Sequence, residues 1–156
     1  METIIALQYN QAMGVYDEKL IEACLSDTNF ITDGKKYVFA KLPFSDYNTL
    51  LSLSPSISDP FFEIILDKNE VTVIVEENIW KIIEERLNPE KIEFPLGNII
   101  CDVTKENPSG YLLKILEVLS PNNIGVYVQG AYTTDNILVD YEDLNKALDL
   151  LKKRYS

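Results

Sequence analysis

The order strand, helix, strand, strand, helix occurs twice in this chain, and the repetition constrains the fold more than any other feature. The C-terminal copy covers residues 97–151, and the earlier copy covers residues 37–87. An offset of 64 residues places Val75 onto Val139, near the end of the last strand in each copy. Recurrence of one supersecondary unit at a fixed offset indicates a duplicated architecture.

The C-terminal copy has the clearer hydrophobic pattern. Apolar residues at helical spacing predict two helices, with stripes at Leu112, Leu113, Leu116 and Leu119 and at Leu144, Ala147, Leu148 and Leu151. We expect Asp140 to cap the second of these helices. Apolar runs and alternation predict strands at residues 97–104, 124–129 and 132–139.

The earlier copy follows the same order. We expect strands at residues 37–42, 61–66 and 71–75 and helices at residues 45–54 and 77–87. Each copy lacks the closing strand of a ferredoxin-like βαββαβ fold. Residues 91–94 are expected to close the earlier copy, and residues 3–7 the C-terminal one. Residues 17–27 form an additional predicted helix.

These elements predict the fold class and the domain division. We expect an α+β protein with two ferredoxin-like units packed side by side. The expected parts are an N-terminal strand and helix in residues 1–36, a first unit in residues 37–96 and a second in residues 97–156.

Charge and composition exclude several classes of function. The formal net charge is −11, and the chain has no histidine. Proteins that bind nucleic-acid backbones need clustered Lys and Arg, so we expect no nucleic-acid partner. Without histidine there is no Ser-His-Asp or Cys-His arrangement, and two cysteines cannot complete an all-cysteine zinc site. We therefore expect no catalytic residue, no metal site and no cofactor.

The sequence also bears on localisation. No stretch approaches the ~20 apolar residues that cross a bilayer, and the first residues lack the basic flank and apolar length of a secretory signal. We expect Cys24 and Cys101 to be free thiols in a reducing compartment. The expected location is the cytoplasm, without a membrane partner.

Part of the chain resembles a known family. Residues 108–116, Pro-Ser-Gly-Tyr-Leu-Leu-Lys-Ile-Leu, and residues 123–128, Asn-Ile-Gly-Val-Tyr-Val, resemble the first strand–helix–strand passage of an ACT domain. Residues 132–139, Tyr-Thr-Thr-Asp-Asn-Ile-Leu-Val, narrow the resemblance to tandem ACT proteins related to the CASTOR arginine sensors. The resemblance covers residues 97–152 well and residues 37–80 more weakly. It implies two ACT repeats and a regulatory protein that senses an amino acid or analogue.

The loop before the helix at residues 112–120 is the candidate ligand site. The first N–H groups of a helix have no intrahelical partner and attract carboxylates, and Gly110 lets a ligand approach the backbone. A purely structural interpretation is also open, in which Asn107 or Ser109 caps the helix. The resemblance implies that two segments enclose the ligand, which gives the candidate residues Ser109, Gly110, Tyr111, Tyr132, Thr133, Thr134 and Asp135.

In that pattern Asp135 pairs with a cationic group of the ligand. The open alternative places Asp135 in a turn or facing solvent. Because small sheets have unpaired edges, we expect at least a homodimer, with the ligand at a repeat or subunit interface. The alternative function is a non-catalytic protein–protein interaction module that has lost ligand binding.

Overall fold

The computed structural model describes residues 16–57, 61–103 and 107–156. It confirms the α+β class, with helices and antiparallel strand pairs. The chain divides into two compact units. Unit 1 comprises the described parts of Met1–Ile31, Ile99–Leu138 and Glu142–Ser156, and unit 2 those of Thr32–Asn98 and Val139–Tyr141.

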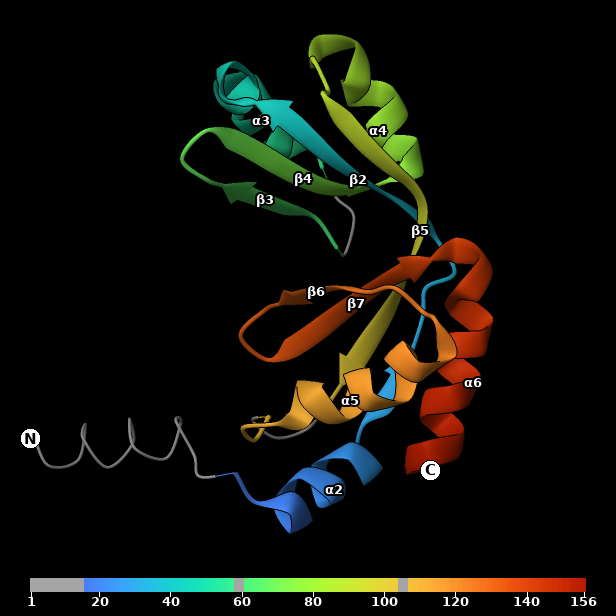
Figure 1. Cartoon of the computed structure of the whole chain (residues 1–156). Coiled ribbons are helices and arrows are strands. Elements are labelled where there is room, and N and C mark those ends of the chain that lie inside the picture. Colours follow the sequence, from blue (N-terminus) through green and yellow to red (C-terminus); the bar gives the residue numbers. More distant parts are fainter. Residues whose placement is uncertain (1–15, 58–60, 104–106) are drawn as a thin grey trace, which may run out of the picture. The chain divides into compact units, whose positions relative to one another are not determined.

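The sheet of unit 2 has the strand order β3-β4-β2-β5. Its strands are β2 (Lys36–Pro43), β3 (Glu63–Leu66), β4 (Glu70–Glu76) and the first part of β5 (Lys91–Asp102). Helices α3 (Tyr47–Leu53) and α4 (Glu77–Ile83) lie on one side of these strands (Figure 1). The strand β5 thus occupies the closing position that the sequence predicts for residues 91–94.

Alternation along β2 and β4 builds the core of unit 2. Residues two apart on a strand point to the same face, so one face of each strand is apolar. The buried strand residues on that face are Val38, Ala40, Leu42, Val71, Val73 and Val75. Leu50 of α3 and Trp80 and Ile83 of α4 pack into the same core.

The sheet of unit 1 has the order β1-β5-β7-β6. It contains β1 (Asn29–Ile31), the last part of β5, β6 (Tyr127–Gly130) and β7 (Thr134–Asp140). Cys101 of β5 lies opposite Phe30 of β1. The helices of this unit are α2 (Glu18–Ser26), α5 (Tyr111–Leu119) and α6 (Leu144–Tyr155).

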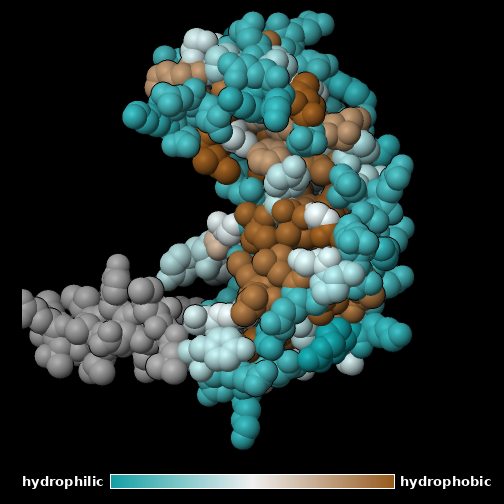
Figure 2. All heavy atoms as spheres, in the orientation of Figure 1, coloured by the Kyte–Doolittle hydropathy of each residue, from teal (hydrophilic) through white to brown (hydrophobic). Residues whose placement is uncertain are grey.

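Helix α6 shows why its sequence forms a helix against a sheet. Its predicted apolar stripe is buried, at Leu144, Ala147, Leu148 and Leu151. The opposite side is hydrophilic, as Figure 2 shows along the outer edge of this helix. A buried stripe with a solvated opposite face is the pattern of an amphipathic surface helix.

One prediction about β5 is wrong. The sequence indicates two strands, at residues 91–94 and 97–104, whereas Lys91–Asp102 form one continuous strand. Where the pairing of β2 with β5 shifts register, Phe94 and Pro95 together face Val38. This is a β-bulge. Proline has no N–H to donate, and a bulge accommodates it without ending the strand.

Two predicted boundaries in unit 1 are also wrong. The strand expected from residue 124 begins at Tyr127. Asp140 is the last residue of β7 and caps no helix, because the 3-10 turn Tyr141–Asp143 precedes α6 and puts Asp143 at its N-cap position. The predicted helix at residues 17–27 is confirmed as α2. Asp17 caps it by accepting hydrogen bonds from the N–H groups of Lys19 and Leu20.

Residues 3–7, which the sequence analysis assigns to the closing strand of unit 1, lie outside the described residues. At that edge of β5 the structure shows β1, which pairs antiparallel through Asn29, Phe30 and Ile31. Cys24 and Cys101 are not joined in a disulfide, which agrees with the prediction. None of the helices in the described ranges has the length and apolar character needed to span a membrane.

Candidate functional site

Gly110 holds the turn that begins α5. Its φ of 93° is in the left-handed region, which glycine adopts without steric cost. Gly110 occupies the N-cap position and no side chain of the described residues caps the helix, so the structural alternative, a cap by Asn107 or Ser109, is not observed. The N–H of Tyr111 donates to the carbonyl of Pro108 at 3.1 Å. Among the described residues nothing accepts a hydrogen bond from the N–H of Leu112 or Leu113.

Asn107 contacts β7 and does not cap α5, which is the structural alternative that the sequence leaves open. Its side-chain amide nitrogen donates a hydrogen bond to Oδ2 of Asp135 at 2.5 Å. The loop before α5 is therefore joined directly to β7. Within the described part of the chain, the side-chain oxygen of Asn107 is buried and has no hydrogen-bond partner.

Asp135 lies neither in a turn nor in solvent, because it is part of β7 and only 9% exposed. It pairs across the ladder with Gly130 of β6. Burial raises the pKa of its carboxyl group, since the charged form loses hydration, and the hydrogen bond from Asn107 partly offsets that rise. A half-desolvated carboxylate with one amide partner can still accept hydrogen bonds from a cationic group.

Tyr111 belongs to the interior of unit 1. Its ring is buried, and its hydroxyl lies 2.9 Å from Oγ1 of Thr28. The Thr28 hydroxyl donates to the carbonyl of Cys24, so the proton in the Thr28–Tyr111 contact comes from Tyr111. Burial raises the pKa of the tyrosine. Burial, together with the nearby charge of Asp135, also raises the pKa of Cys101 to about 12, which leaves this thiol protonated and unreactive.

The remaining candidate residues are more exposed. Tyr132 is 94% exposed and, like Thr133, precedes β7 in the connection from β6. Thr134 is half-buried, and its carbonyl accepts from the N–H of Ala131 at 2.9 Å. Ser109 is exposed. The structure thus brings the Gly110 turn, Tyr111 and Asp135 into one region. Ser109, Tyr132, Thr133 and Thr134 lie at its more exposed outside.

Sequence reasoning missed two residues that lie against the Gly110 turn. A Cβ added at Gly110 would lie 2.7 Å from Cε2 of Tyr16 and 3.0 Å from Cδ1 of Ile21. Both side chains come from the start of the chain, which carries no recognisable motif. The helical pattern of residues 17–27 predicts α2 but not the surface that α2 covers.

The described residues offer no group of three or more His, Cys, Asp or Glu side chains that could hold a metal ion. The Asp135 carboxylate carries negative charge and accepts from the amide of Asn107, while the first N–H groups of α5 are hydrogen-bond donors. Negative charge and hydrogen-bond donors are the two kinds of group that a small zwitterion requires.

One family model matches this region of the chain. The family model for the ACT domain matches residues 101–153, which include α5, β6, β7 and most of α6. No curated protein matches the chain.

Solved structures share the fold at low sequence identity. A Vibrio cholerae protein of unknown function, described as a possible transport protein, is 20% identical with a TM-score of 0.66 over 88% of this chain and 98% of its own. The regulatory subunit of aspartate kinase from Thermus thermophilus is 7% identical with a TM-score of 0.62, covering 83% of this chain and 99% of that one. Aspartate kinase from Clostridium acetobutylicum is 15% identical with a TM-score of 0.57, covering 78% of this chain and 33% of that one.

Proposed function

We propose that this protein is a non-catalytic regulatory protein that binds an amino acid or analogue next to the N-terminus of α5. The ACT match over residues 101–153 supports a small-molecule-binding role. The likeness to an aspartate kinase regulatory subunit supports a regulatory fold. In this proposal the ligand carboxylate meets the N–H groups of Leu112 and Leu113, and its cationic end meets Asp135.

The observation that carries the proposal is the hydrogen bond between Asn107 and Asp135. It ties the loop in front of α5 to the strand that bears the carboxylate, so the two poles of the proposed site belong to one structural region. A buried carboxylate costs stability unless it is compensated, and a cationic ligand group would supply that compensation.

We further propose that unit 2 is a second ACT-type repeat. Its strand order β3-β4-β2-β5 is β2-β3-β1-β4 when the strands are numbered within the unit. Unit 1 has the same order if β1 of the chain is counted as its last strand. Both orders are those of a ferredoxin-like sheet, which supports two related repeats. We place the ligand in unit 1, at a subunit interface of a homodimer in the cytoplasm, where the two cysteines, which form no disulfide, would remain reduced.

A thermal-shift screen against the twenty standard amino acids tests the proposal. A ligand present at 100 times its Kd adds about 2.7 kcal/mol to the free energy of unfolding. We expect one amino acid or a small group of them to raise the melting temperature of the wild-type protein, and the same addition to raise that of Asp135→Asn by less. A uniform absence of stabilisation would contradict the proposal.

A protein–protein interaction module without a small ligand is the second candidate, because Tyr16 and Ile21 fill the space in front of Gly110. In that case the absence of a side chain at Gly110 leaves room for Tyr16 and Ile21, and no ligand reaches the turn. The same screen separates the two functions, since an interaction module would not be stabilised by any amino acid.

A further inference from the structure

The start of α2 covers the turn to which the proposed ligand would bind. A Cβ at Gly110 would approach two ring carbons of Tyr16 to 2.7 and 2.8 Å, and Cδ1 of Ile21 to 3.0 Å. These contacts are shorter than a methyl group tolerates. The ring of Tyr16 and a ligand that reaches the Gly110 backbone therefore require the same space.

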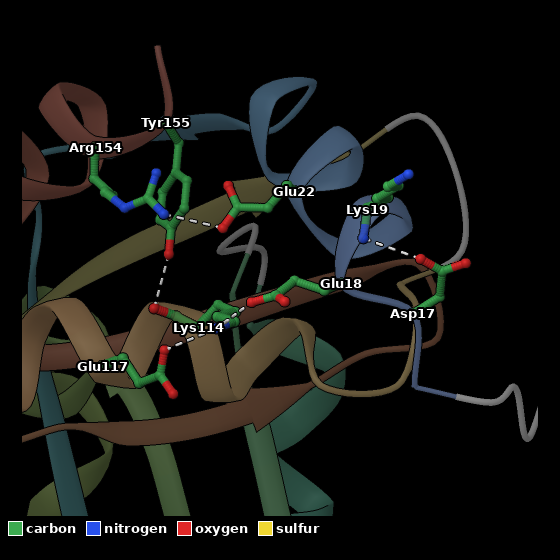
Figure 3. Close-up of polar contacts among 8 residues, drawn as sticks. All are labelled: Asp17, Glu18, Lys19, Glu22, Lys114, Glu117, Arg154 and Tyr155. Atoms are coloured by element: carbon green, nitrogen blue, oxygen red, sulfur yellow. Dashed lines mark hydrogen bonds and ion pairs between the residues drawn. The ribbon is translucent and has the colours of Figure 1, made fainter.

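Tyr16 and Ile21 are held very differently. Ile21 is fully buried, whereas Tyr16 is 51% exposed. Tyr16 precedes the first helical residue of α2, and its neighbour Asp17 directs its carboxylate to the N–H groups of α2 itself (Figure 3). Ile21 therefore forms a fixed wall beside the turn, and Tyr16 is the part that can leave.

The ion pair that joins the first turn of α2 to α5 is weak. Glu18 reaches the ammonium group of Lys114 at 3.3 Å, but the Glu18 side chain is 67% exposed. Exposed ion pairs contribute little to stability. Lys114 also lies 3.2 Å from Glu117 on its own helix, so it keeps an anionic partner when Glu18 moves away (Figure 3).

The rest of α2 is anchored more firmly. Leu25 is fully buried, and Glu22 pairs with Arg154 of α6 at 3.0 Å (Figure 3). Just after the helix, the side-chain hydroxyls of Thr28 and Tyr111 form a hydrogen bond at 2.9 Å. These contacts allow the first turn to open while the helix stays attached, as the low-stability end of an element commonly does.

We infer that Tyr16 is a displaceable cover of the Gly110 turn, and that ligand binding and the seated position of Tyr16 exclude each other. This inference rests on the proposed function. Binding would release the first turn of α2, so that occupancy of the site alters the conformation of the start of α2. The apparent Kd of the wild type equals the intrinsic Kd divided by the fraction of molecules in which Tyr16 has left the turn.

Three variants of the full chain test this inference by calorimetric titration with the twenty standard amino acids, each taken singly. Tyr16→Ala removes the ring. Tyr16→Phe keeps both ring carbons that contact Gly110, and Leu20→Ala truncates another exposed side chain of α2 (55% exposed). We expect Tyr16→Ala to bind about tenfold more tightly than wild type, which corresponds to a cover seated in about 90% of molecules. Tyr16→Phe and Leu20→Ala should resemble wild type.

Amide hydrogen exchange detects whether ligand binding opens the first turn of α2, an effect that is not expected if the role of Tyr16 is purely structural. The N–H of Ile21 donates to the carbonyl of Asp17 at 2.9 Å, so its protection reports the first turn of α2. We expect the bound amino acid to speed exchange in this turn of the wild type and to slow exchange at the start of α5.

The outcomes separate this inference from the proposed function. Binding to the wild type with equal or weaker binding to Tyr16→Ala overturns the cover and leaves the proposed function standing. Binding to Tyr16→Ala alone supports both. If none of the proteins binds any of the twenty amino acids, the proposed function fails. The inference about Tyr16 then fails as well, because no ligand competes with its ring for the Gly110 turn.

Discussion

The side-chain amide of Asn107 donates a hydrogen bond to the buried carboxylate of Asp135, which lies 28 residues further along the chain. The amide of Asn107 is therefore engaged with Asp135 and not with the N-terminus of α5, the alternative role that its position in the sequence leaves open. The hydrogen bond also makes the environment of the Asp135 carboxylate depend on two segments, the loop before α5 and the strand β7. The predictions that follow concern this pair, the neighbouring turn and the assembly of the protein.

Asp135→Asn should make the ligand-free protein more stable at neutral pH. Because burial raises the pKa of Asp135, the folded protein holds its proton more tightly than the unfolded chain does. The carboxylate therefore contributes a destabilisation that is present above the folded pKa and disappears as pH falls toward the ordinary value of about 3.9. Urea unfolding at neutral and acidic pH should show a gain for the variant at neutral pH only. Asp149→Asn, on the exposed side of α6, is the control that should show no such gain.

The same Asp135→Asn substitution should weaken amino-acid binding by about 1.5–3 kcal/mol, the scale of a hydrogen bond to a charged group. The amide keeps the shape of the side chain and can still accept from Asn107, but it has no charge for the ligand. Calorimetric titration measures the loss. Unchanged affinity would remove Asp135 from the site.

Asn107→Ala should destabilise the protein by about 1–3 kcal/mol, because a buried carboxylate loses its hydrogen-bond donor. It should also raise the pKa of Asp135 further, since the hydrogen bond from Asn107 lowers it. NMR titration of the carboxyl group and denaturant unfolding check the two effects. In the Asp135→Asn background the destabilisation should be smaller, and a fully additive double variant would argue against direct coupling.

Gly110→Ala should lower the free energy of unfolding by at least about 1–2 kcal/mol, the cost of a side chain in the left-handed region. Its methyl group also meets the Tyr16 ring, so Tyr16→Ala should recover part of the loss. Gly125→Ala is a matched control, because no atom lies within 4 Å of its added Cβ. Equal melting temperatures for Gly110→Ala and Gly125→Ala would show that the turn is not strained.

The purified protein should sediment as a homodimer or larger species at tens of micromolar, well above typical dimer Kd values. The reason is that β3 and β6 end the described strand order, and the edge strands of a sheet are templates for pairing with another chain. Analytical ultracentrifugation distinguishes this from a 17.8 kDa monomer. A monomer at that concentration would contradict the prediction.

The sequence predicts the buried elements well because their side-chain periodicity reflects the packing itself. The stripe from Leu144 to Leu151 faces the interior of unit 1, and the alternation from Val71 to Val75 forms the core of unit 2. Element ends are predicted less well, since several residues can compete for one cap. Asp140 and Asp143 both have the chemistry of a cap, but the 3-10 turn Tyr141–Asp143 puts Asp143 at the N-cap position of α6, where its side chain makes no capping hydrogen bond.

The candidate site is less predictable than the fold because it depends on contacts between segments far apart in the chain. A glycine before an apolar helix predicts a turn at Gly110, and the structure confirms the turn. It does not reveal that Tyr16 fills the space in front of it, because neither residue carries a pattern that depends on the other. The role of Asn107 is hidden for the same reason.

Unit 1 takes its strands from both sides of unit 2 in the chain, and this has a consequence for folding during synthesis. β1 leaves the ribosome before nearly all of unit 2, yet its partner residues in β5 are made only afterwards, since Phe30 pairs with Cys101. At about 5–20 residues per second, β1 waits for several seconds without its partner. Unit 2 has nearly all of its chain available in that interval. Translation therefore favours an order in which unit 2 is completed before unit 1, and in which β1 is paired only after β5 has been made.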